Sequence, residues 1–379
     1  MKMYIEPLSK EALEKYLAIP DLTQSTQPHA IKLVYEQIAE YMRSSHPQSD
    51  VRVYRKDPIV TVEENYDHLL IAADNTSRSS TYTHYVDERH ILRTHTSAHL
   101  PGILRELARQ DDWEDVVILL PGLAYRRDVS DKKHVSEVHM LEMWRVVKNN
   151  ARRPVTKDDL LTVVKGVAAT AAPGWQLRIV DTSHPYTEGG IEVNVVKGER
   201  DIEILECGLI RAKILERASL DPKAHSGWAL GMGLDRLVMT LKGIPDIRYL
   251  RSINPKIAAQ MANLEPYHGV SKQPAIRRDL SYSVPQRYVE EDISDDIRQA
   301  LGDKLDTLES VEVLSETPCA ELPEKIRERL GCQPSQKNVL VRITLRHLEQ
   351  SITNKEANHI YETIYAKVNK GTGGYYMPT

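Results

Sequence analysis

The sequence predicts an α+β protein, in which a largely antiparallel sheet surrounded by helices is followed by a smaller α+β domain. Ile191–Val196 and Asp201–Cys207 have the pattern of two strands joined by a hairpin turn. His29–Met42 carries apolar residues at the spacing of an amphipathic helix. From about Val270 onward the elements follow a β-α-β-β-α order, which is typical of a ferredoxin-like domain.

The first half of the chain supplies much of the predicted sheet. A short helix at Lys10–Ala18 and the amphipathic helix precede a strand at Val51–Arg55. Residues 116–147 then predict a strand, a tight turn at Pro121-Gly122, a second strand that ends near Tyr125, a polar loop and a third strand. Alternate residues of a strand share a face. One face of the third strand therefore carries Val138, Met140 and Glu142, and the other carries His139, Leu141 and Met143.

The later elements follow from the same patterns. Lys157–Ala172 is predicted to be a helix that Pro173-Gly174 ends, and Trp175–Val180 is predicted to be a further strand. A buried helix is marked at i, i+3, i+4 and i+7 by Leu234, Leu237, Val238 and Leu241. The C-terminal domain is predicted to contain strands at Ile276–Val284, Ser310–Glu316 and Asn338–Arg346, a helix at Val289–Leu301, and a last helix opened by a capping box at Thr353–Glu356.

The end of the predicted second strand carries a candidate phosphate site. Arg126 stands at the strand end, Asp128 follows two residues later, and His134 lies in the loop. A guanidinium group matches the oxygens of a phosphate, and a neighbouring acid can hold that group in place. A solvated Arg-Arg-Asp turn explains the same residues about equally well.

The composition is that of an ordinary globular protein. The 379 residues are 41% hydrophobic and 27% charged, with a formal net charge of −4, whereas indiscriminate nucleic-acid binders carry a basic excess. The cysteines at 207, 319 and 332 form no CxxC pair, so neither a zinc cluster nor a disulfide framework is indicated. No apolar run reaches membrane-spanning length, and no membrane contact is expected. The lack of a signal-peptide core predicts a cytoplasmic protein.

Phenylalanine is absent from the chain, although a protein of this size normally contains on the order of a dozen. Tyrosine, with 18 copies, compensates only in part. Drift leaves some phenylalanine behind, so its complete removal indicates selection or design.

Several segments together resemble class II aminoacyl-tRNA synthetases of the phenylalanyl type. Gly122–Glu142 resembles the second signature motif of that class, and Arg93–Leu100 resembles its His-Thr-Ser element. Gly227–Leu237 resembles the third motif, and Gly243–Arg248 continues the match. The order and spacing agree over roughly residues 50 to 260. Because independent motifs in register are far more specific than one motif, the resemblance is strong.

The resemblance implies an ATP site and a magnesium site. It assigns ATP binding to Arg126, Asp128, His134, Val138, Glu203, Gly233 and Arg236. Arg126, Arg236 and Glu203 are the implied catalytic residues, because charge that develops on the α-phosphate must be neutralised. Glu192 and Glu203, on paired strands, are the implied ligands of Mg²⁺, which prefers oxygen ligands. Without the resemblance, two such glutamates are more typical of a solvated face.

The resemblance also implies an amino-acid pocket, and here the sequence departs from the family. The implied pocket residues are His95, Ser97, Leu100, Met140, Glu142, His184, Tyr186, Cys207, Ala229 and Gly231. His95 and Ser97 fit a carboxylate-binding role, and Glu142 can hold an ammonium group. The family usually has two glutamines where Leu100 and Met140 stand, a loss of about 1–3 kcal/mol each if nothing replaces them. His184-Pro185-Tyr186 replaces the usual Phe-Pro-Phe.

Two accounts of this pocket remain open. In the first the protein charges tRNA with phenylalanine, and the absence of phenylalanine codons permits its own synthesis when charged tRNA is scarce. In the second the pocket has moved to a different or modified amino acid, which the two missing glutamines favour. A paralogue that serves a non-tRNA acceptor and a non-catalytic tRNA-binding protein are further rivals. The complete ATP set argues against the last of these.

The resemblance extends to the C-terminal domain, which is similar to the anticodon-binding domain of one-chain, mitochondrial-type members. It implies a tRNA partner, with tRNA-Phe as the expected species, and favours a monomer, with a homodimer as the alternative. The implied tRNA-binding residues are Arg277, Arg278, Tyr282, Arg342, Arg346 and His347, with Tyr282 as a stacking surface on one basic face. The domain nevertheless has slightly more acidic than basic residues. The expected division is a helical segment at 1–50, a catalytic domain at 51–262 and the anticodon-binding domain at 270–379.

Overall fold

The computed structural model describes residues 5–127, 134–198, 200–270, 273–347 and 350–373. The chain divides into two compact units. The first comprises residues 1–126, 137–244 and 260–266, and the second comprises residues 127–136, 245–259 and 267–379. Each unit has its own sheet and its own hydrophobic core.

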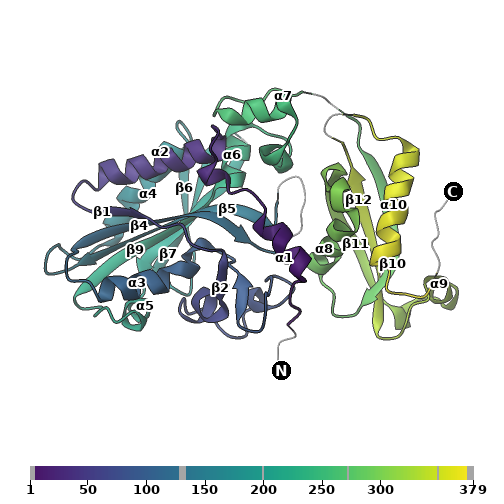
Figure 1. Ribbon diagram of the computed structural model, residues 1–379, viewed down its shortest axis with the longest axis horizontal. Coiled ribbons are helices and arrows are strands. Elements are labelled where there is room, and N and C mark those ends of the chain that lie inside the picture. The colour runs from purple at the N-terminus through teal and green to yellow at the C-terminus, as the bar shows by residue number, and fades with distance from the viewer. Residues whose placement is uncertain (1–4, 128–133, 199, 271–272, 348–349, 374–379) are drawn as a thin grey trace. The chain divides into compact units, whose positions relative to one another are not determined.

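Seven strands among the described residues form the main sheet of the first unit, in the order β1-β4-β5-β9-β8-β7-β6 (Figure 1). Their bounds are β1 Asp50–Val53, β4 Asp115–Tyr125, β5 Glu137–Lys148, β6 Gln176–Asp181, β7 Thr187–Lys197, β8 Arg200–Ile210 and β9 His225–Gly233. The pair β1–β4 is parallel, and the other neighbouring pairs are antiparallel. The predicted α+β class with a largely antiparallel sheet is confirmed.

Helices cover both faces of this sheet (Figure 1). One face carries α2 Ala30–Ser45, α4 Lys157–Ala171 and α6 Leu234–Lys242. The other carries α3 Leu100–Ala108, α5 Ala212–Arg217 and the small ladder of β2 Ile59–Thr61 with β3 His90–Leu92. Helix α1 Lys10–Leu17 packs Leu13 and Tyr16 against Leu123 and Tyr125 at the end of β4.

The predicted tight turn at Pro121-Gly122 is wrong, because β4 runs straight through both residues and pairs them with β5. Strand β1 accompanies β4 only as far as Leu119. Beyond that point no strand of the described residues pairs with the other side of β4, so a proline there breaks no ladder hydrogen bond. Gly122 has a φ of 153°, and an added Cβ would lie 2.4 Å from Nη2 of Arg93. Glycine is therefore required at this position.

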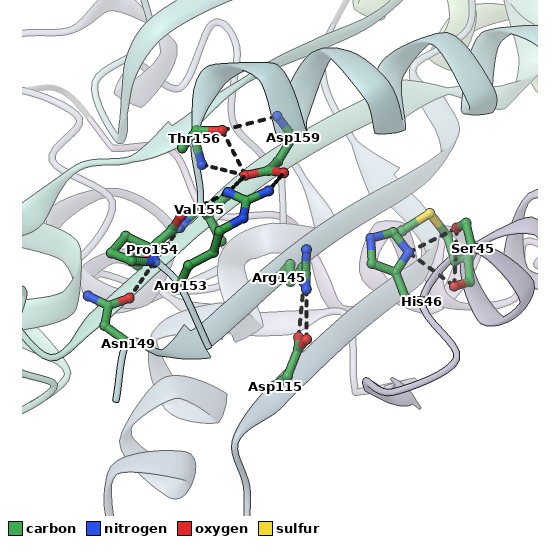
Figure 2. A network of polar contacts seen from close by, with 12 residues as sticks. Ser45, His46, Asp115, Arg145, Asn149, Arg153, Pro154, Val155, Thr156 and Asp159 are labelled. Atoms are coloured by element: carbon green, nitrogen blue, oxygen red, sulfur yellow. Dashed lines mark hydrogen bonds and ion pairs between the residues drawn. The ribbon is translucent and has the colours of Figure 1, made fainter. Parts of the chain in front are cut away.

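Polar contacts fix the start of α4 and join β4 to β5 (Figure 2). Nε and Nη2 of Arg145 donate to the two carboxylate oxygens of Asp115 at 2.9 and 2.7 Å. Thr156 and Asp159 form a capping box at the first turn of α4, and Arg153 donates to the same Asp159. Arg145 lies on the sheet face opposite Glu142, because the two residues are an odd number of positions apart on β5.

The second unit contains three antiparallel strands among its described residues, in the order β10-β12-β11. Their bounds are β10 Ile276–Pro285, β11 Leu308–Pro318 and β12 Gln336–Leu345. Helices α8 Glu290–Leu301 and α10 Asn354–Val368 complete the predicted β-α-β-β-α order, and α10 opens with the predicted Thr353–Glu356 capping box. The short helices α7 Pro255–Ala258 and α9 Glu324–Leu330 also belong to this unit.

Two of the three cysteines form a disulfide, although their spacing in the sequence gave no indication of one. Cys319 and Cys332 form a disulfide with Cα atoms 6.0 Å apart. Both are buried in one cluster with Leu330, the last residue of α9, so the disulfide joins the two ends of the segment that contains this helix. Cys207 is free and buried. Among the described helices, none combines the length and the apolar character needed to cross a membrane.

Candidate active site

One face of the main sheet carries a row of three carboxylates. Glu142 on β5 pairs with Gly231 on β9, and Gly231 pairs in turn with Glu206 on β8. Glu206 pairs with Glu192 on β7. Residues directly opposite one another in an antiparallel ladder point to the same face. The row therefore runs across four strands, with a glycine between the first two acids.

A bulge in β8 adds a fourth carboxylate to this face. Leu205 pairs with Val193, but the next pair joins Glu203 to Asn194, so one residue of β8 is left over. Simple alternation would turn Glu203 and Glu206 to opposite faces, and the extra residue brings them to the same face. Glu206 was missed in the sequence, because no residue pattern marks the bulge.

Glu203 lies within electrostatic reach of both predicted catalytic arginines. Burial raises its pKa, and the negative charges of Glu206 and Glu192 raise it further. The guanidinium groups of Arg236 and Arg126 act in the opposite direction. Two arginines from distant segments of the chain thus bring positive charge to one carboxylate, as a site for a nucleotide phosphate requires.

A backbone contact holds Arg126 in place, and a side-chain contact of the residue before Arg236 fixes the helix that carries it. Nε of Arg126 donates to the backbone carbonyl of Thr94 at 2.9 Å. Arg236 lies in the first turn of α6, and the preceding residue, Asp235, is fully buried. Asp235 accepts from the backbone N–H of His139 at 2.5 Å and lies 3.0 Å from its Nδ1. This contact joins α6 to β5, and the sequence motif gave no sign of the histidine's part in it.

Glu142 is buried beside Ser97 on the same face. Burial raises its pKa to about 7, while a hydrogen bond from the Ser97 side chain and the charge of Arg126 oppose that shift. Oγ of Ser97 also accepts from Nε1 of Trp144 at 3.1 Å. An added Cβ on Gly231 would lie 2.7 Å from Oε2 of Glu142. The carboxylate thus occupies the space that the glycine leaves open.

His95 is neutral, and its ring N–H is already used in a hydrogen bond to the backbone. Its Nε2 lies 3.1 Å from the backbone carbonyl of Asn65, which can only accept. Burial, and then the charge of Arg126, lower the pKa of His95 to about 3. Nδ1 is therefore an acceptor, and the predicted carboxylate-binding role of His95 is wrong in this arrangement. The Asn65 side chain also bonds Thr94 twice and so fixes the turn before Ser97.

His184 and Tyr186 lie at the edge of the same face. Nε2 of His184 lies 2.9 Å from Oε2 of Glu206. This pairing raises the pKa of His184 and lowers the pKa of Glu206. The His184 ring stacks on Tyr186 with a centroid distance of 6.0 Å, and Tyr186 lies 5.7 Å from the ring of Trp144. Burial raises the pKa of Tyr186.

The other predicted pocket residues divide between the two faces. Val138 and Met140 share the face of Glu142 by alternation along β5, and Gly233 and Ala229 share that of Gly231. Leu100 is fully buried in the core beside Ala229. Cys207 pairs with Leu230 and lies on the opposite face, so its predicted pocket role is wrong.

Two predicted ATP-binding residues lie outside this geometry. Asp128 falls outside the described residues, and His134 belongs to the second unit. Their roles stay predictions.

The glutamates fit an ion that arrives with a nucleotide. Burial, and then the charges of Glu206 and Glu192, raise the pKa of Glu203, and a divalent cation would relieve the repulsion between these carboxylates. Among the described residues no group of three or more acids, histidines or cysteines is arranged to hold a metal by itself. Mg²⁺ commonly takes one or two carboxylates and completes its shell with water and phosphate oxygens. The residues present fit that mode.

The predicted basic face of the second unit is only partly present. Tyr282 has 0% exposure, so its predicted stacking on RNA is wrong. Arg278 faces the helices and donates to Asn358 and Asn354 of α10, so it does not share a face with the other arginines. Arg342 forms a bidentate pair with Asp279.

Two further residues of the predicted set have different positions. Arg346 pairs with Glu309. Arg277 is exposed at the start of β10. It is therefore the strongest remaining candidate for a phosphate contact, and the role of His347 stays a prediction.

Comparison with known proteins decides the family. The family model for the core domain of class II tRNA synthetases, type F, matches residues 18–261. This chain belongs to the class II tRNA synthetases. The synthetase is 28% identical to the chloroplastic/mitochondrial phenylalanine–tRNA ligase of Arabidopsis thaliana, over 90% of this chain and 76% of that protein. It is 26% identical to the probable mitochondrial enzyme of Drosophila melanogaster, over 89% and 82%.

These relatives confirm the predicted resemblance and correct one prediction. The mitochondrial phenylalanine–tRNA ligase of Saccharomyces cerevisiae is 25% identical, over 83% of this synthetase and 80% of that protein. The predicted cytoplasmic location is wrong, because the relatives are named as mitochondrial or chloroplastic proteins. A solved pyrrolysyl-tRNA synthetase from Desulfitobacterium hafniense aligns with a TM-score of 0.47 and 20% identity, over 64% of this chain and 79% of that one.

Proposed function

We propose that this synthetase activates phenylalanine with ATP, forms phenylalanyl-adenylate, and transfers the phenylalanyl group to tRNA-Phe. The names of the relatives support the substrate and the acceptor. The main support for this reaction is the position of Glu203, whose carboxylate interacts electrostatically with the guanidinium groups of both Arg126 and Arg236. A protein that only binds tRNA has no use for that arrangement.

In the proposed reaction the residues on the sheet face position the two reactants. Glu142 holds the α-ammonium group of phenylalanine, which sets the carboxylate toward Arg126. The amino-acid carboxylate attacks the α-phosphorus of ATP, pyrophosphate leaves, and Arg126 neutralises the charge that develops on the phosphate. Arg236 covers the adenine from the first turn of α6. Holding both reactants in line removes much of the entropic barrier.

Mg²⁺ supplies further neutralisation of phosphate charge when it is bound. Glu203 and Glu192 are its proposed protein ligands, and Asn194 orients Glu192 by donating to Oε1 at 2.7 Å. Because Glu203 pairs with Asn194 rather than with Glu192, the two carboxylates lie at neighbouring positions on one face and would together hold the ion.

ATP–pyrophosphate exchange with a panel of amino acids tests this proposal. We expect exchange with phenylalanine above all others, and charging of tRNA-Phe with the same amino acid. Exchange with a different amino acid alone would support a shifted pocket. Exchange without charging of any tRNA would indicate another acceptor, and no exchange at all would contradict the proposal.

We also propose that the second unit contacts tRNA and that the synthetase acts as a monomer. The β-α-β-β-α order and the exposed Arg277 support the tRNA contact. Arg277→Glu should raise the KM for tRNA and leave amino-acid exchange unchanged, because exchange needs no tRNA. An equal loss in both assays would contradict the contact. Light scattering in solution tests the monomer.

A further inference from the structure

A bound α-ammonium group has three N–H donors, and each needs an acceptor when water is excluded. On the sheet face around Glu142 few side chains offer such an acceptor. Met140 offers only a thioether sulfur, a weak acceptor. Leu100 is fully buried and has no polar atom. The hydroxyl of Ser97 accepts from Trp144 at one of its two lone pairs, which leaves at most one acceptor position. Glu142 therefore needs a partner to complete an ammonium site.

Glu206 is the charged acceptor best placed to be that partner. Glu142 and Glu206 are both paired to Gly231, from opposite sides, and point to the same face. Their Cα atoms are separated by two strand spacings, on the order of 10 Å. Because Gly231 has no side chain, the Glu142 carboxylate lies over it, on the side of the strand that faces Glu206. A single ammonium group can be reached by both glutamate side chains from there.

His184 holds Glu206 in position. Nε2 of His184 lies 2.9 Å from Oε2 of Glu206. The His184 side chain is 12% exposed and the Glu206 side chain is 42% exposed, so water is largely kept from the histidine side of the pair. The ring of His184 is itself supported by its stacking on Tyr186. Glu206 raises the pKa of His184, and the negative charges of Glu142 and Glu203 raise it further. A fixed acceptor costs less entropy on binding than a mobile one.

We propose that Glu206, positioned by His184, is a second substrate-binding carboxylate, which accepts a hydrogen bond from the α-ammonium group across Gly231 from Glu142. This inference rests on the proposed function and adds a residue to its amino-acid site. Glu206 takes the place of polar contacts that Leu100 and Met140 do not offer. It also explains why a histidine stands at position 184, where an aromatic ring alone would give Glu206 no partner.

The experiment compares inhibitors that differ in the ammonium group. L-phenylalaninol keeps the ring and the ammonium group, whereas 3-phenylpropanoate keeps the ring and the carboxylate and lacks the ammonium group. Both are measured as competitors of phenylalanine in ATP–pyrophosphate exchange by the full-length chain. The variant Glu206→Gln keeps the size of the side chain and removes its charge. Asp201→Asn removes one negative charge from the same strand at an exposed position and serves as the control.

The proposal predicts a selective loss. Glu206→Gln should weaken phenylalaninol and raise the KM for phenylalanine by about tenfold or more, since hydrogen bonds to charged groups are the strong ones. Its inhibition by 3-phenylpropanoate and its KM for ATP should stay within about twofold of the parent chain. Asp201→Asn should change none of these. His184→Gln, which keeps a donor for Glu206, should show a smaller rise in KM than His184→Leu, with kcat little changed.

Other outcomes overturn the proposal. An equal loss for both inhibitors would place Glu206 against the ring or in a structural role. A raised KM for ATP with unchanged phenylalaninol binding would place it with the magnesium ligands. An unchanged Glu206→Gln variant would exclude the contact. If the parent chain itself shows no exchange with phenylalanine, the proposed function has failed, which is a result distinct from each of these.

Discussion

The replacement Gly231→Ala tests the amino-acid site at its tightest point. The added Cβ would lie 2.7 Å from Oε2 of Glu142 and 2.9 Å from its Cδ and its Oε1. Ordinary van der Waals contacts begin near 3.4 Å, so the carboxylate must move by several tenths of an ångström or more. Glu142 is buried beside Ser97 and the backbone of β9, so the carboxylate leaves the position in which it can meet an ammonium group.

The size of the effect follows from the contact that is lost. A hydrogen bond to a charged group contributes about 1.5–3 kcal/mol, and each 1.36 kcal/mol is a factor of ten. Gly231→Ala should therefore raise the KM for phenylalanine by about 10- to 150-fold. The KM for ATP should change little, because the clash does not reach Arg126 or Arg236.

Gly233→Ala is the matched comparison, two residues along the same strand and on the same face. An added Cβ there meets only Cγ1 of Val138, at 3.9 Å. It should leave the KM for phenylalanine within about twofold and change only the KM for ATP, because Gly233 belongs to the proposed adenine site. ATP–pyrophosphate exchange gives both constants. Equal values of the phenylalanine KM for the two variants would refute the placement of the ammonium site over Gly231.

Three further predictions follow from the same geometry. Arg126→Ala should reduce exchange by at least about 100-fold, as loss of a preorganised charge does elsewhere; appreciable residual exchange would contradict its role at the phosphate. The affinity for phenylalanine should fall as the pH drops below about 7, because Glu142 must be ionised to hold an ammonium group and burial raises its pKa to about 7. A KM for phenylalanine that stays constant from about pH 5.5 to about pH 8 would contradict this. Tyr282→Phe should raise the free energy of unfolding by about 1 kcal/mol, because the buried hydroxyl has no hydrogen-bond partner among the described residues; a loss of stability in urea denaturation would contradict it.

The fold was largely predictable because its signals are local. Alternation marks the strands, 3.6-residue spacing marks the helices, and the Thr353–Glu356 capping box marks the start of α10. The error at Pro121-Gly122 arose because proline and glycine together usually mark a turn. Whether they interrupt a strand depends on what lies beside it, and the end of β1 at Val53 is a property of the tertiary structure.

The site was predictable where it depends on motifs and unpredictable where it depends on register. Glu142, Arg126 and Arg236 stand in segments with strong patterns. Glu206 was missed because a one-residue bulge in β8 turns it to the face of Glu203. Cys207, the next residue, was placed in the pocket although it faces the other way. A single extra residue changes the face of every side chain beyond it.

Tyr282 shows how the absence of phenylalanine affects the structure. The sequence suggested an exposed ring that stacks on RNA, but the residue is in the core of the second unit. A buried hydroxyl without a partner is unfavourable, and an aromatic ring without that hydroxyl would suit the same space. Tyr282 therefore supports the account in which tyrosine replaces phenylalanine for reasons outside the pocket.

The central claim is that Arg126 and Arg236 act on one nucleotide beside Glu203. A crystal structure of the chain soaked with ATP, Mg²⁺ and phenylalanine tests it most directly. The account predicts the α-phosphate within hydrogen-bonding distance of Arg126, the adenine beneath Arg236, and the ion on Glu203. A nucleotide bound elsewhere, or one that contacts neither arginine, would contradict the claim.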